Sequence, residues 1–388
     1  MDKKLKPILT IIFTVFLCVV ITPLSFGFFI LLVLSNYPTF FIALPILFAV
    51  IIFMLIWWNT NKSYRITFFI LLASFTILLF SCGGFFIYKL LYLPSITVHE
   101  KPNGNVYDFL PFEKNSLVAK LEEESSLQLK ENIPVIDGAT ALFPIYSAFA
   151  RACFPEAVCK LNEENSSLKY TNTVGAYDGL IDGTRDIIFC AGPSVKQIEA
   201  ACEKGLILQC TPIGKEAFVF FVNAKNPIDS LRASDIRKIY SGEITNWKEL
   251  GGADEKIKAF QRAENSGSQT ALERFMGTVP LQKAPSEEVP NFMGGIVERV
   301  QDYRNNRGAI GYSFRYFVNE MQEANRIKLL KIDGVAPTVE TIKNGTYPLA
   351  NYFYAVTTEN SKNVLPFLDW ILSPQGQYLI EKTGYVGL

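Results

Sequence analysis

The chain has 388 residues, with 37 basic and 37 acidic side chains and a single histidine, His99. A net charge of zero argues against nucleic acid as a partner. One histidine leaves little for the usual metal sites and catalytic triads, so the sequence predicts no metal, no cofactor and no enzyme activity. Apolar residues crowd into 1–93, whereas 94–388 has the composition of an ordinary soluble protein, long enough for two lobes.

Three apolar segments each approach the roughly 20 residues that cross a bilayer as a helix: 8–34, 40–58 and 66–93. A cluster of lysines precedes the first segment, and Lys62 and Arg65 lie between the second and third. By the positive-inside rule the N-terminus is cytoplasmic, and three crossings place the rest of the chain outside. We therefore expect a multi-pass protein of the cell membrane whose soluble part, from residue 94 on, is extracytoplasmic.

Two other interpretations of the N-terminal part are weaker. A cleaved signal peptide would be shorter, and two more apolar segments follow the first. Lipid attachment at Cys82 is disfavoured because Phe80 suits such a site badly and the chain stays apolar after Gly83.

Residues 94–132 form a polar connector, whose aromatic residues predict some packing on the main body. The soluble part has five cysteines, an odd number, so at least one thiol is unpaired within it. Cys153 and Cys159 are close enough in sequence for a local disulfide, which an extracellular setting would permit. Buried free thiols are an equally good reading.

From residue 133 on, strands and helices alternate. The sequence predicts strands at 133–136, 169–173, 186–190, 206–212, 217–223, 257–262, 309–313, 327–332 and 352–357. It predicts helices at 142–152, 175–181, 194–204, 234–240, 247–250, 268–276 and 296–305, with two more between about 364 and 382. Such alternation is typical of a parallel-rich α/β sheet with sites at the loops that follow strands.

The stretch around Arg262 predicts an anion site. A strand ends at Arg262, a turn follows, and a helix begins near Ser268, its predicted N-cap. The first N–H groups of a helix have no internal partner, and Gly267 lets an anion approach them closely. Arg262 can offer its fork of donors to a tetrahedral oxyanion. On an extended chain Glu264 would share a face with Arg262 and hold its guanidinium.

Two more strand–loop–helix junctions carry glycine and threonine. One runs over 137–141 and includes Thr140, and the other contains Thr171, Thr173 and Gly175. Each alone is a routine loop, but convergence of three such junctions would hold an anion without many basic side chains.

These residues carry a family resemblance. The stretches are Asp137–Pro144, Pro212–Ala217 with Val219–Asn223, Ile239–Trp247, Arg262–Ser268, Gly308–Tyr312 and Tyr347–Leu349. Together they resemble the phosphate-binding proteins of phosphate ABC transporters, which have the type II periplasmic-binding-protein fold. The resemblance covers about 133–388 and leaves the three apolar segments unmatched.

The resemblance implies an α/β, two-lobe binding domain over 133–388, preceded by three transmembrane helices at 1–93 and the connector at 94–132. Lobe I would comprise about 133–217 plus 330–388, and lobe II about 218–329. Two crossing segments would let the lobes close around a dehydrated phosphate. The implied ligand-binding residues are Thr140, Ala141, Thr173, Arg262, Ser266, Gly267 and Ser268, with Glu264 in support.

One position departs from the family pattern. The family usually has an aspartate after the strand corresponding to 186–190, which accepts a hydrogen bond from the phosphate hydroxyl, whereas this chain has Ala191. An oxyanion site is therefore better supported than phosphate selectivity.

The expected function is binding of inorganic phosphate or a related oxyanion for delivery to the permease subunits of an ABC importer. A membrane-anchored sensor or scaffold that binds an anion without transporting it is the alternative.

Overall fold

The structure is a computed structural model that describes residues 106–284, 289–290, 293–302, 306–321 and 326–388. The chain divides into two compact units, Met1–Pro94 and Ser95–Leu388, and every described residue belongs to the second. All three predicted membrane spans lie outside the described residues. Within the described part of the chain, no helix is both long enough and apolar enough to cross a membrane.

The second unit is built on a seven-stranded sheet of order β1-β2-β9-β3-β6-β5, with β7 also paired to β3, and β4 and β8 form a separate pair. The strands are β1 (Ile136–Gly138), β2 (Ile187–Cys190), β3 (Gln209–Asn223), β4 (Ser230–Leu231), β5 (Lys258–Ala259), β6 (Ala309–Phe314), β7 (Ile327–Leu329), β8 (Lys331–Ile332) and β9 (Ala350–Thr357).

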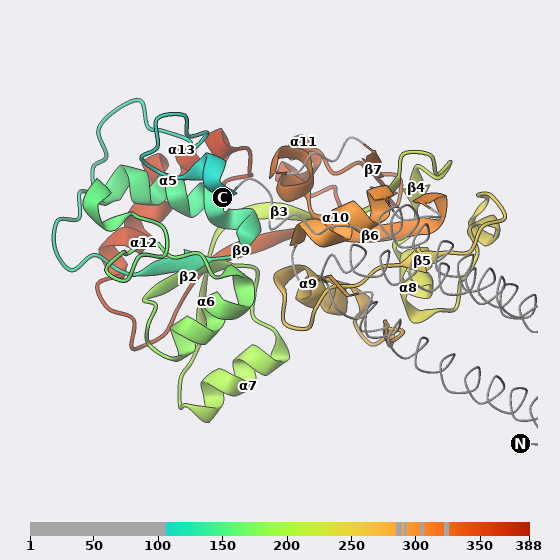
Figure 1. Ribbon diagram of the computed structural model, residues 1–388, viewed down its shortest axis with the longest axis horizontal. Coiled ribbons are helices and arrows are strands. Elements are labelled where there is room, and N and C mark those ends of the chain that lie inside the picture. Colours follow the sequence, from blue (N-terminus) through green and yellow to red (C-terminus); the bar gives the residue numbers. More distant parts are fainter. Residues whose placement is uncertain (1–105, 285–288, 291–292, 303–305, 322–325) are drawn as a thin grey trace, which may run out of the picture. The chain divides into compact units, whose positions relative to one another are not determined.

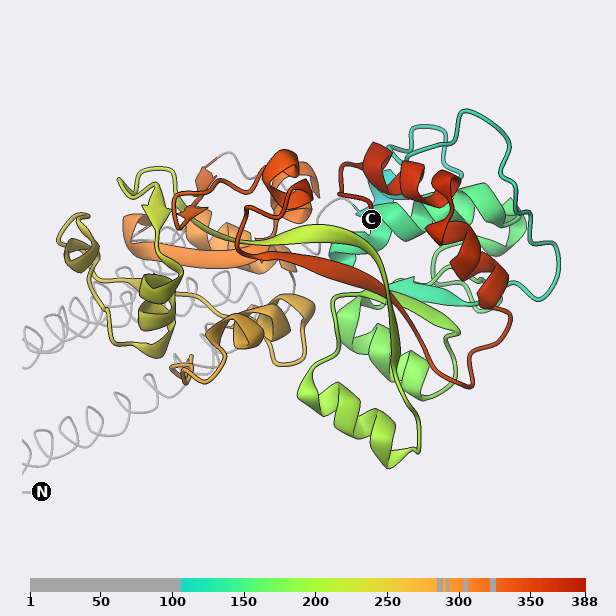
Figure 2. The ribbon, with the colours of Figure 1, turned by 180° about the vertical axis from the view of Figure 1, so that it is seen from behind.

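Two long strands connect the two lobes. β3 and β9 pair antiparallel from Gln209 opposite Thr357 to Ala217 opposite Ala350, and they run side by side between two groups of helices (Figures 1 and 2). Beyond Ala217, β3 continues into a second set of ladders, with β6 and β7. The run from Ala217 to Val222 is apolar on both faces and at most 1% exposed, as expected for a strand covered on both sides.

The sheet is mixed, so the prediction of a parallel-rich sheet is wrong. In the main sheet, β1 pairs parallel to β2 and β5 to β6, whereas β2–β9, β3–β9, β3–β6 and β3–β7 are antiparallel. The reason is that the two crossing strands run in opposite directions and take part in most of the ladders. Alternation along the sequence does not reveal such crossings.

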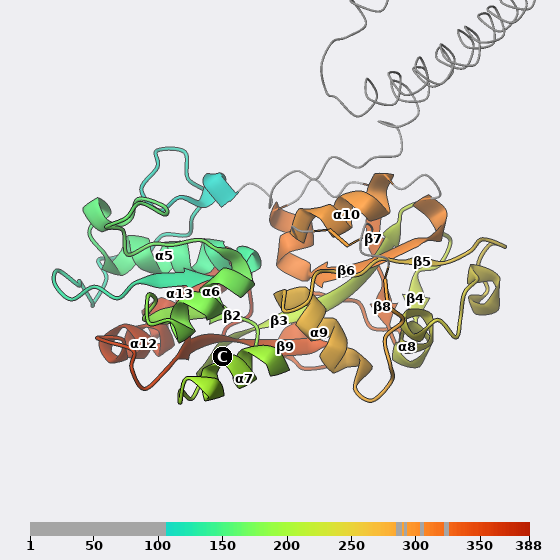
Figure 3. The same cartoon turned by 60° about the horizontal axis from the view of Figure 1, so that its bottom comes forward.

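The first lobe, here lobe I, consists of the described residues up to 216 together with 351–388. Its helices are α5 (Phe143–Cys153), α6 (Asn172–Ile181), α7 (Val195–Glu203), α12 (Leu365–Leu372) and α13 (Pro374–Thr383). In Figure 3, α6 lies on β1 and β2, α5 lies on β1, and α13 packs on α5. The apolar side of α5 is buried almost completely, with Tyr146 stacked on Phe189 of β2 at a ring-centroid distance of 5.5 Å.

The second lobe, lobe II, consists of the described residues between 217 and 350. Its helices are α8 (Ala233–Ser241), α9 (Gly267–Met276), α10 (Met293–Asp302) and α11 (Val339–Lys343). α10 lies on β6, as Figure 3 shows. Trp247, 1% exposed, anchors the loop after α8 by donating its indole N–H to the Gly308 carbonyl oxygen at 3.0 Å.

The chain returns from lobe II to lobe I near residue 350, about 20 residues later than the predicted residue 330. Ser230 and Leu231 of β4 pair with β8. Downstream, the Tyr347 hydroxyl donates to the Phe218 carbonyl oxygen at 3.0 Å. Residues 330–349 therefore pack on lobe II, and the chain returns to lobe I only along β9.

The connector packs on lobe I, as its aromatic residues predicted. Phe109 and Val118 are 5% and 4% exposed, although Tyr107 is 75% exposed. Ser147 and Arg151 of α5 donate hydrogen bonds to carbonyl oxygens of the connector, at Phe109 and Pro111.

The five described cysteines are free thiols, so the local disulfide is excluded. Cys153 and Cys159 are 0% and 6% exposed. Burial raises the pKa of each thiol to about 12, which makes it an unreactive small hydrophobe.

A candidate anion site between the lobes

A pocket of about 260 Å³ lies between the two lobes. Lobe I contributes Ala139 and Ala141 from the first junction and Ala191 from the loop after β2, while lobe II contributes Gly267 and Arg274 of α9. Backbone from two of the predicted junctions thus lines one cavity. Such a position, reached by both lobes and by the first turn of a helix, suits an anion that the lobes enclose together.

The first turn of α9 differs in one detail from the prediction. Ser266, not Ser268, occupies the N-cap with extended φ and ψ of −67° and 145°. Its hydroxyl donates to the Ala263 carbonyl oxygen at 2.7 Å and so does not cap the helix. The first helical hydrogen bond runs from Thr270 N–H to Ser266 O at 2.9 Å. The amides of Gly267, Ser268 and Gln269 therefore have no partner within the helix, as the anion hypothesis requires.

Gly267 also touches the third junction. A Cβ built on Gly267 would lie only 3.1 Å from Thr173 Oγ1, so the first turns of α6 and α9 meet here. Thr173 lies in α6 and not in a strand, because the helix begins at Asn172 and the bridge to β1 that precedes it is the one between Leu168 and Ile136. Its side chain is 8% exposed.

We expect Gly267→Ala to weaken anion binding about tenfold or more. The added methyl group would stand against Thr173 Oγ1 and in the pocket, at the point where an anion must approach the amides. Stability should change little, because alanine is favoured in helices and Gly267 does not have a positive φ. Titration with phosphate beside a thermal melt tests both parts, and unchanged affinity would place the anion elsewhere.

Arg262 is held in place through its backbone. Its N–H is shared between Gln269 Oε1 at 3.0 Å and the Tyr312 hydroxyl at 2.8 Å, and the Tyr312 hydroxyl donates to the same Gln269 oxygen. Gln269 thereby ties the end of the β5 segment to the first turn of α9. The Arg262 side chain is buried, with the residue 7% exposed, and it lowers the pKa of the Tyr312 phenol, which burial raises more strongly.

Glu264 does not take the predicted place beside Arg262. Its carboxylate accepts a bond from Lys196 Nζ of α7 at 2.6 Å, and its side chain is 68% exposed. The prediction assumed an extended chain through 264, but β5 ends at Ala259, and a turn at Glu264 and Asn265, with Asn265 at φ 64°, redirects the side chain.

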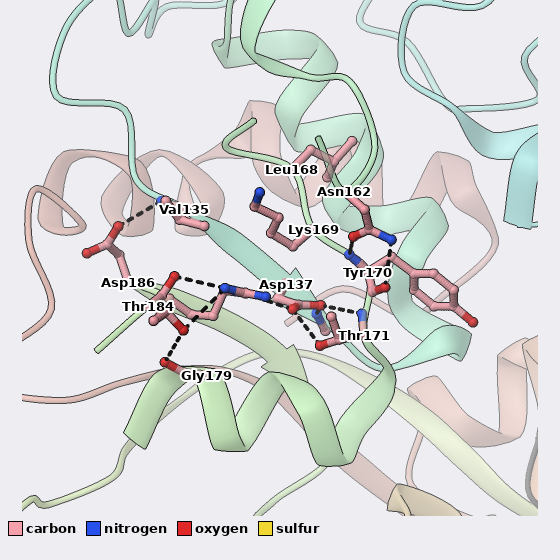
Figure 4. Close-up of polar contacts among 12 residues, drawn as sticks. Val135, Asp137, Asn162, Leu168, Lys169, Tyr170, Thr171, Gly179, Thr184 and Asp186 are labelled. Atoms are coloured by element: carbon pink, nitrogen blue, oxygen red, sulfur yellow. Dashed lines mark hydrogen bonds and ion pairs between the residues drawn. The ribbon is translucent and has the colours of Figure 1, made fainter. Parts of the chain in front are cut away.

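Asp137 organises the other two junctions. The residue is 0% exposed, and Figure 4 shows its carboxylate at the centre of a hydrogen-bond network. Oδ1 accepts from the N–H groups of Gly138 and Thr171 at 2.8 and 2.9 Å, and Oδ2 accepts from Thr171 Oγ1 at 2.7 Å and Arg185 Nε at 2.9 Å. One buried carboxylate therefore fixes the first junction to the segment that leads into α6.

Thr140 and Ala141 begin a single turn of 3-10 helix, Thr140–Leu142. Thr140 is 5% exposed, and its hydroxyl lies 3.1 Å from the Tyr170 hydroxyl. The Ala141 carbonyl oxygen accepts a bond from the Tyr385 hydroxyl near the C-terminus. The predicted ligand-binding residues are thus all buried or nearly so. Ala141 and Gly267 line the pocket, whereas Thr140, Thr173, Arg262, Ser266 and Ser268 are not among its lining residues.

Three charged residues in the pocket wall were not predicted: Glu216, Arg237 and Arg274. Arg237 donates to the Phe275 carbonyl oxygen at 2.8 Å, and Arg274 donates to the Pro193 carbonyl oxygen at 2.6 Å. The sequence held one usable signal, since Glu216 directly precedes the apolar run Ala217–Val222, where a buried charge is costly unless it is paired.

Contacts across the pocket join the lobes on the side of α7. The Ser194 hydroxyl bonds to Asn265 Oδ1 at 2.9 Å, and Gln197 Nε2 donates to the Asn265 carbonyl oxygen at 3.4 Å. With the Arg274–Pro193 bond, they bring the first turn of α7 against the turn before α9. These three bonds connect lobe I directly to lobe II.

A two-lobe α/β unit with paired crossing strands and a pocket between the lobes is the architecture of a solute-binding protein. A family described as PBP superfamily domain matches residues 131–375. The chain belongs to this superfamily, and the prediction of a two-lobe fold of the periplasmic-binding-protein type is confirmed.

Two of the curated relatives to which the chain is similar are named phosphate-binding proteins. It is 26% identical over 270 residues to the phosphate-binding protein PstS of Borreliella burgdorferi, covering 67% of this chain and 92% of that protein. It is 27% identical over 280 residues to the phosphate-binding protein PstS of Bacillus subtilis, covering 70% and 84%. A solved structure, an ABC-type phosphate transport receptor from Vibrio cholerae, is similar with a TM-score of 0.48 and 22% identity, covering 65% of this chain and 99% of that one.

Proposed function

We propose that this protein binds inorganic phosphate in the pocket between its lobes, as the substrate-binding component of a phosphate ABC transporter. It is a binding protein and not an enzyme. The observation that carries the proposal is that Ala141 and Gly267, from two separate junctions, line one cavity, with Thr173 of the third junction packed against Gly267. The names of the relatives from Borreliella burgdorferi and Bacillus subtilis support phosphate as the anion.

The chemistry of the site suits a small, doubly charged solute. Unpartnered amides at the start of α9 supply donors at fixed positions, and the helix dipole adds partial positive charge. The hydroxyls of Thr140, Thr173 and Ser268 are buried close by, at 3–8% exposure, and Arg262 adds a guanidinium. Donors held in place before binding lose little entropy when the anion arrives.

Isothermal titration of the full-length chain with phosphate, sulfate and arsenate tests the function. We expect binding of phosphate, and of arsenate because it has nearly the same shape and charge. An absence of heat with all three anions would refute an oxyanion site in this protein.

The membrane part of the proposal rests on the sequence. Three apolar segments before residue 94 and the positions of the nearby basic residues support a multi-pass anchor with a cytoplasmic N-terminus. The binding unit would then work outside the cell, next to the permease subunits that receive the solute.

Protease added to intact cells tests this orientation. We expect external protease to cleave the connector or the binding unit without lysis. If the binding unit survives in intact cells and is cut only in lysates, the three-span topology is wrong.

A further inference from the structure

Glu216 is the one acid among the pocket-lining residues that the structure describes. It lies on β3 at the crossing between the lobes, opposite Asn351 of β9, and is 6% exposed. The two cations in the wall, Arg237 and Arg274, are bonded to carbonyl oxygens of lobe II and lobe I. The negative charge of Glu216 is therefore the unusual feature in a cavity that otherwise suits an anion.

The carboxylate of Glu216 is held from two directions. Its Oε1 accepts from the Ala217 N–H at 2.8 Å and lies 3.7 Å from Arg315 Nε, while Oε2 accepts from the Tyr316 N–H at 3.2 Å. Each carboxylate oxygen has two acceptor positions, so Oε2 keeps capacity for one more donor. Arg315 also donates to the Gly384 carbonyl oxygen of lobe I at 2.6 Å, which fixes the guanidinium behind Glu216.

The same cluster contacts the first junction. Tyr316 stacks on Tyr385 at a ring-centroid distance of 4.3 Å, and the Tyr385 hydroxyl donates to the Ala141 carbonyl oxygen. Glu216 and Ala141 thus belong to one packed group as well as to one pocket wall.

An acceptor at this place would decide between similar anions. Sulfate and hydrogen phosphate have the same shape, and amides, hydroxyls and a guanidinium can hold either. Hydrogen phosphate has an O–H that needs an acceptor, and sulfate has none, so a carboxylate with a free acceptor position favours the first and repels the second. The loop after β2 supplies no carboxylate, because residue 191 is alanine.

We propose that Glu216 is the residue that makes this site selective for hydrogen-bearing oxyanions, by accepting a hydrogen bond from the hydroxyl of bound phosphate. The inference rests on the proposed function and adds the residue that sets its specificity. In this proposal β3 supplies the carboxylate acceptor that the loop after β2 lacks.

The ionisation of Glu216 gives the inference a pH signature. Burial raises the pKa of Glu216 to about 7, against a smaller opposing effect of Arg315. The other titratable groups around it are the buried phenols of Tyr316 and Tyr385, whose pKa values lie far above neutrality, and Glu320, which acts on both phenols. Above pH 7 Glu216 is charged and excludes sulfate, whereas below pH 7 it is neutral and the exclusion relaxes.

The test compares phosphate and sulfate affinities of the full-length chain and of Glu216→Gln. The wild type should prefer phosphate, and Glu216→Gln should reduce the ratio of the two affinities by about 10–100-fold, the value of one charge-assisted hydrogen bond. Glu243→Gln is the matched control, because Glu243 is 63% exposed in its pair with Lys238, and it should leave the ratio unchanged.

A second measurement follows sulfate affinity against pH. Sulfate does not titrate near neutral pH, so its affinity for the wild type should increase about tenfold from pH 8 to pH 6, whereas Glu216→Gln should show no such change.

Three results would overturn the inference: equal affinities for phosphate and sulfate in the wild type, an unchanged ratio in a folded Glu216→Gln protein, or wild-type sulfate affinity that does not depend on pH. A wild type that binds neither anion would instead refute the proposed function.

Discussion

Arg262→Ala should reduce phosphate affinity by about 3–4 kcal/mol, or 100–1,000-fold, while the protein remains folded. Two charge-assisted hydrogen bonds from one guanidinium are worth about this much. The fold should persist because the bonds of residue 262 to Gln269 and Tyr312 come from its backbone N–H, which alanine retains. Isothermal titration measures the affinity, and a thermal melt reports the fold.

Two further variants of arginine make this result interpretable. Arg262→Lys keeps the charge but not the fork of donors, so we expect a smaller loss. Arg307→Ala is a control in the same lobe: its side chain is 55% exposed and lies 3.6 Å from Glu255, and its removal should leave affinity unchanged. If Arg262→Ala binds phosphate as tightly as the wild type, Arg262 is a structural residue and not a ligand.

Asp137→Ala should destabilise the protein by about 3 kcal/mol. Removal of one partner from a buried, hydrogen-bonded ion pair leaves the other partner uncompensated. Here Arg185, whose side chain is 16% exposed, and the two donors of Thr171 would lose their acceptor. Because Asp137 joins two junctions of the site, phosphate binding should weaken as well. Urea unfolding followed by tryptophan fluorescence measures the stability.

An exposed acid of the same lobe provides a control. Asp182→Ala removes an exposed acid, with a side chain 56% exposed, that pairs with Lys204 on the surface, and it should not change stability measurably. Asp137→Asn keeps the side-chain volume and one acceptor, so its free energy of unfolding should lie between those of Asp137→Ala and Asp182→Ala. If Asp137→Ala is as stable as the wild type, the network in Figure 4 does not hold the junctions together.

The sequence predicted the junctions better than the sheet. Turn residues and apolar periodicity are local, so α9 and its preceding turn were found within two residues of their place. The position of Gly267 at a pocket wall followed from the same local chemistry. By contrast, the pairing of Gln209–Asn223 with Ala350–Thr357 joins segments far apart in the chain, and no local pattern encodes it.

Apart from the N-cap of α9 and the strand expected at 169–173, the errors share one cause, since each concerned a long-range partner. Glu264 was assigned to Arg262 two residues away, but the structure gives it Lys196 of α7. The lobe boundary was placed at about residue 330, whereas the pairing of β4 with β8 moves it to β9. Asp137 was assigned only to the first junction, although its burial among donors from 171 and 185 makes it the link between two junctions.

A crystal structure of the protein with bound phosphate tests the central claim most directly. The account predicts the anion between the lobes, with its oxygens about 2.7–3.2 Å from the amide of Gly267 and from the guanidinium of Arg262, and with the first junction at Ala141 on its other side. Phosphate bound at another surface, or a guanidinium of Arg262 directed away from the anion, would contradict the account.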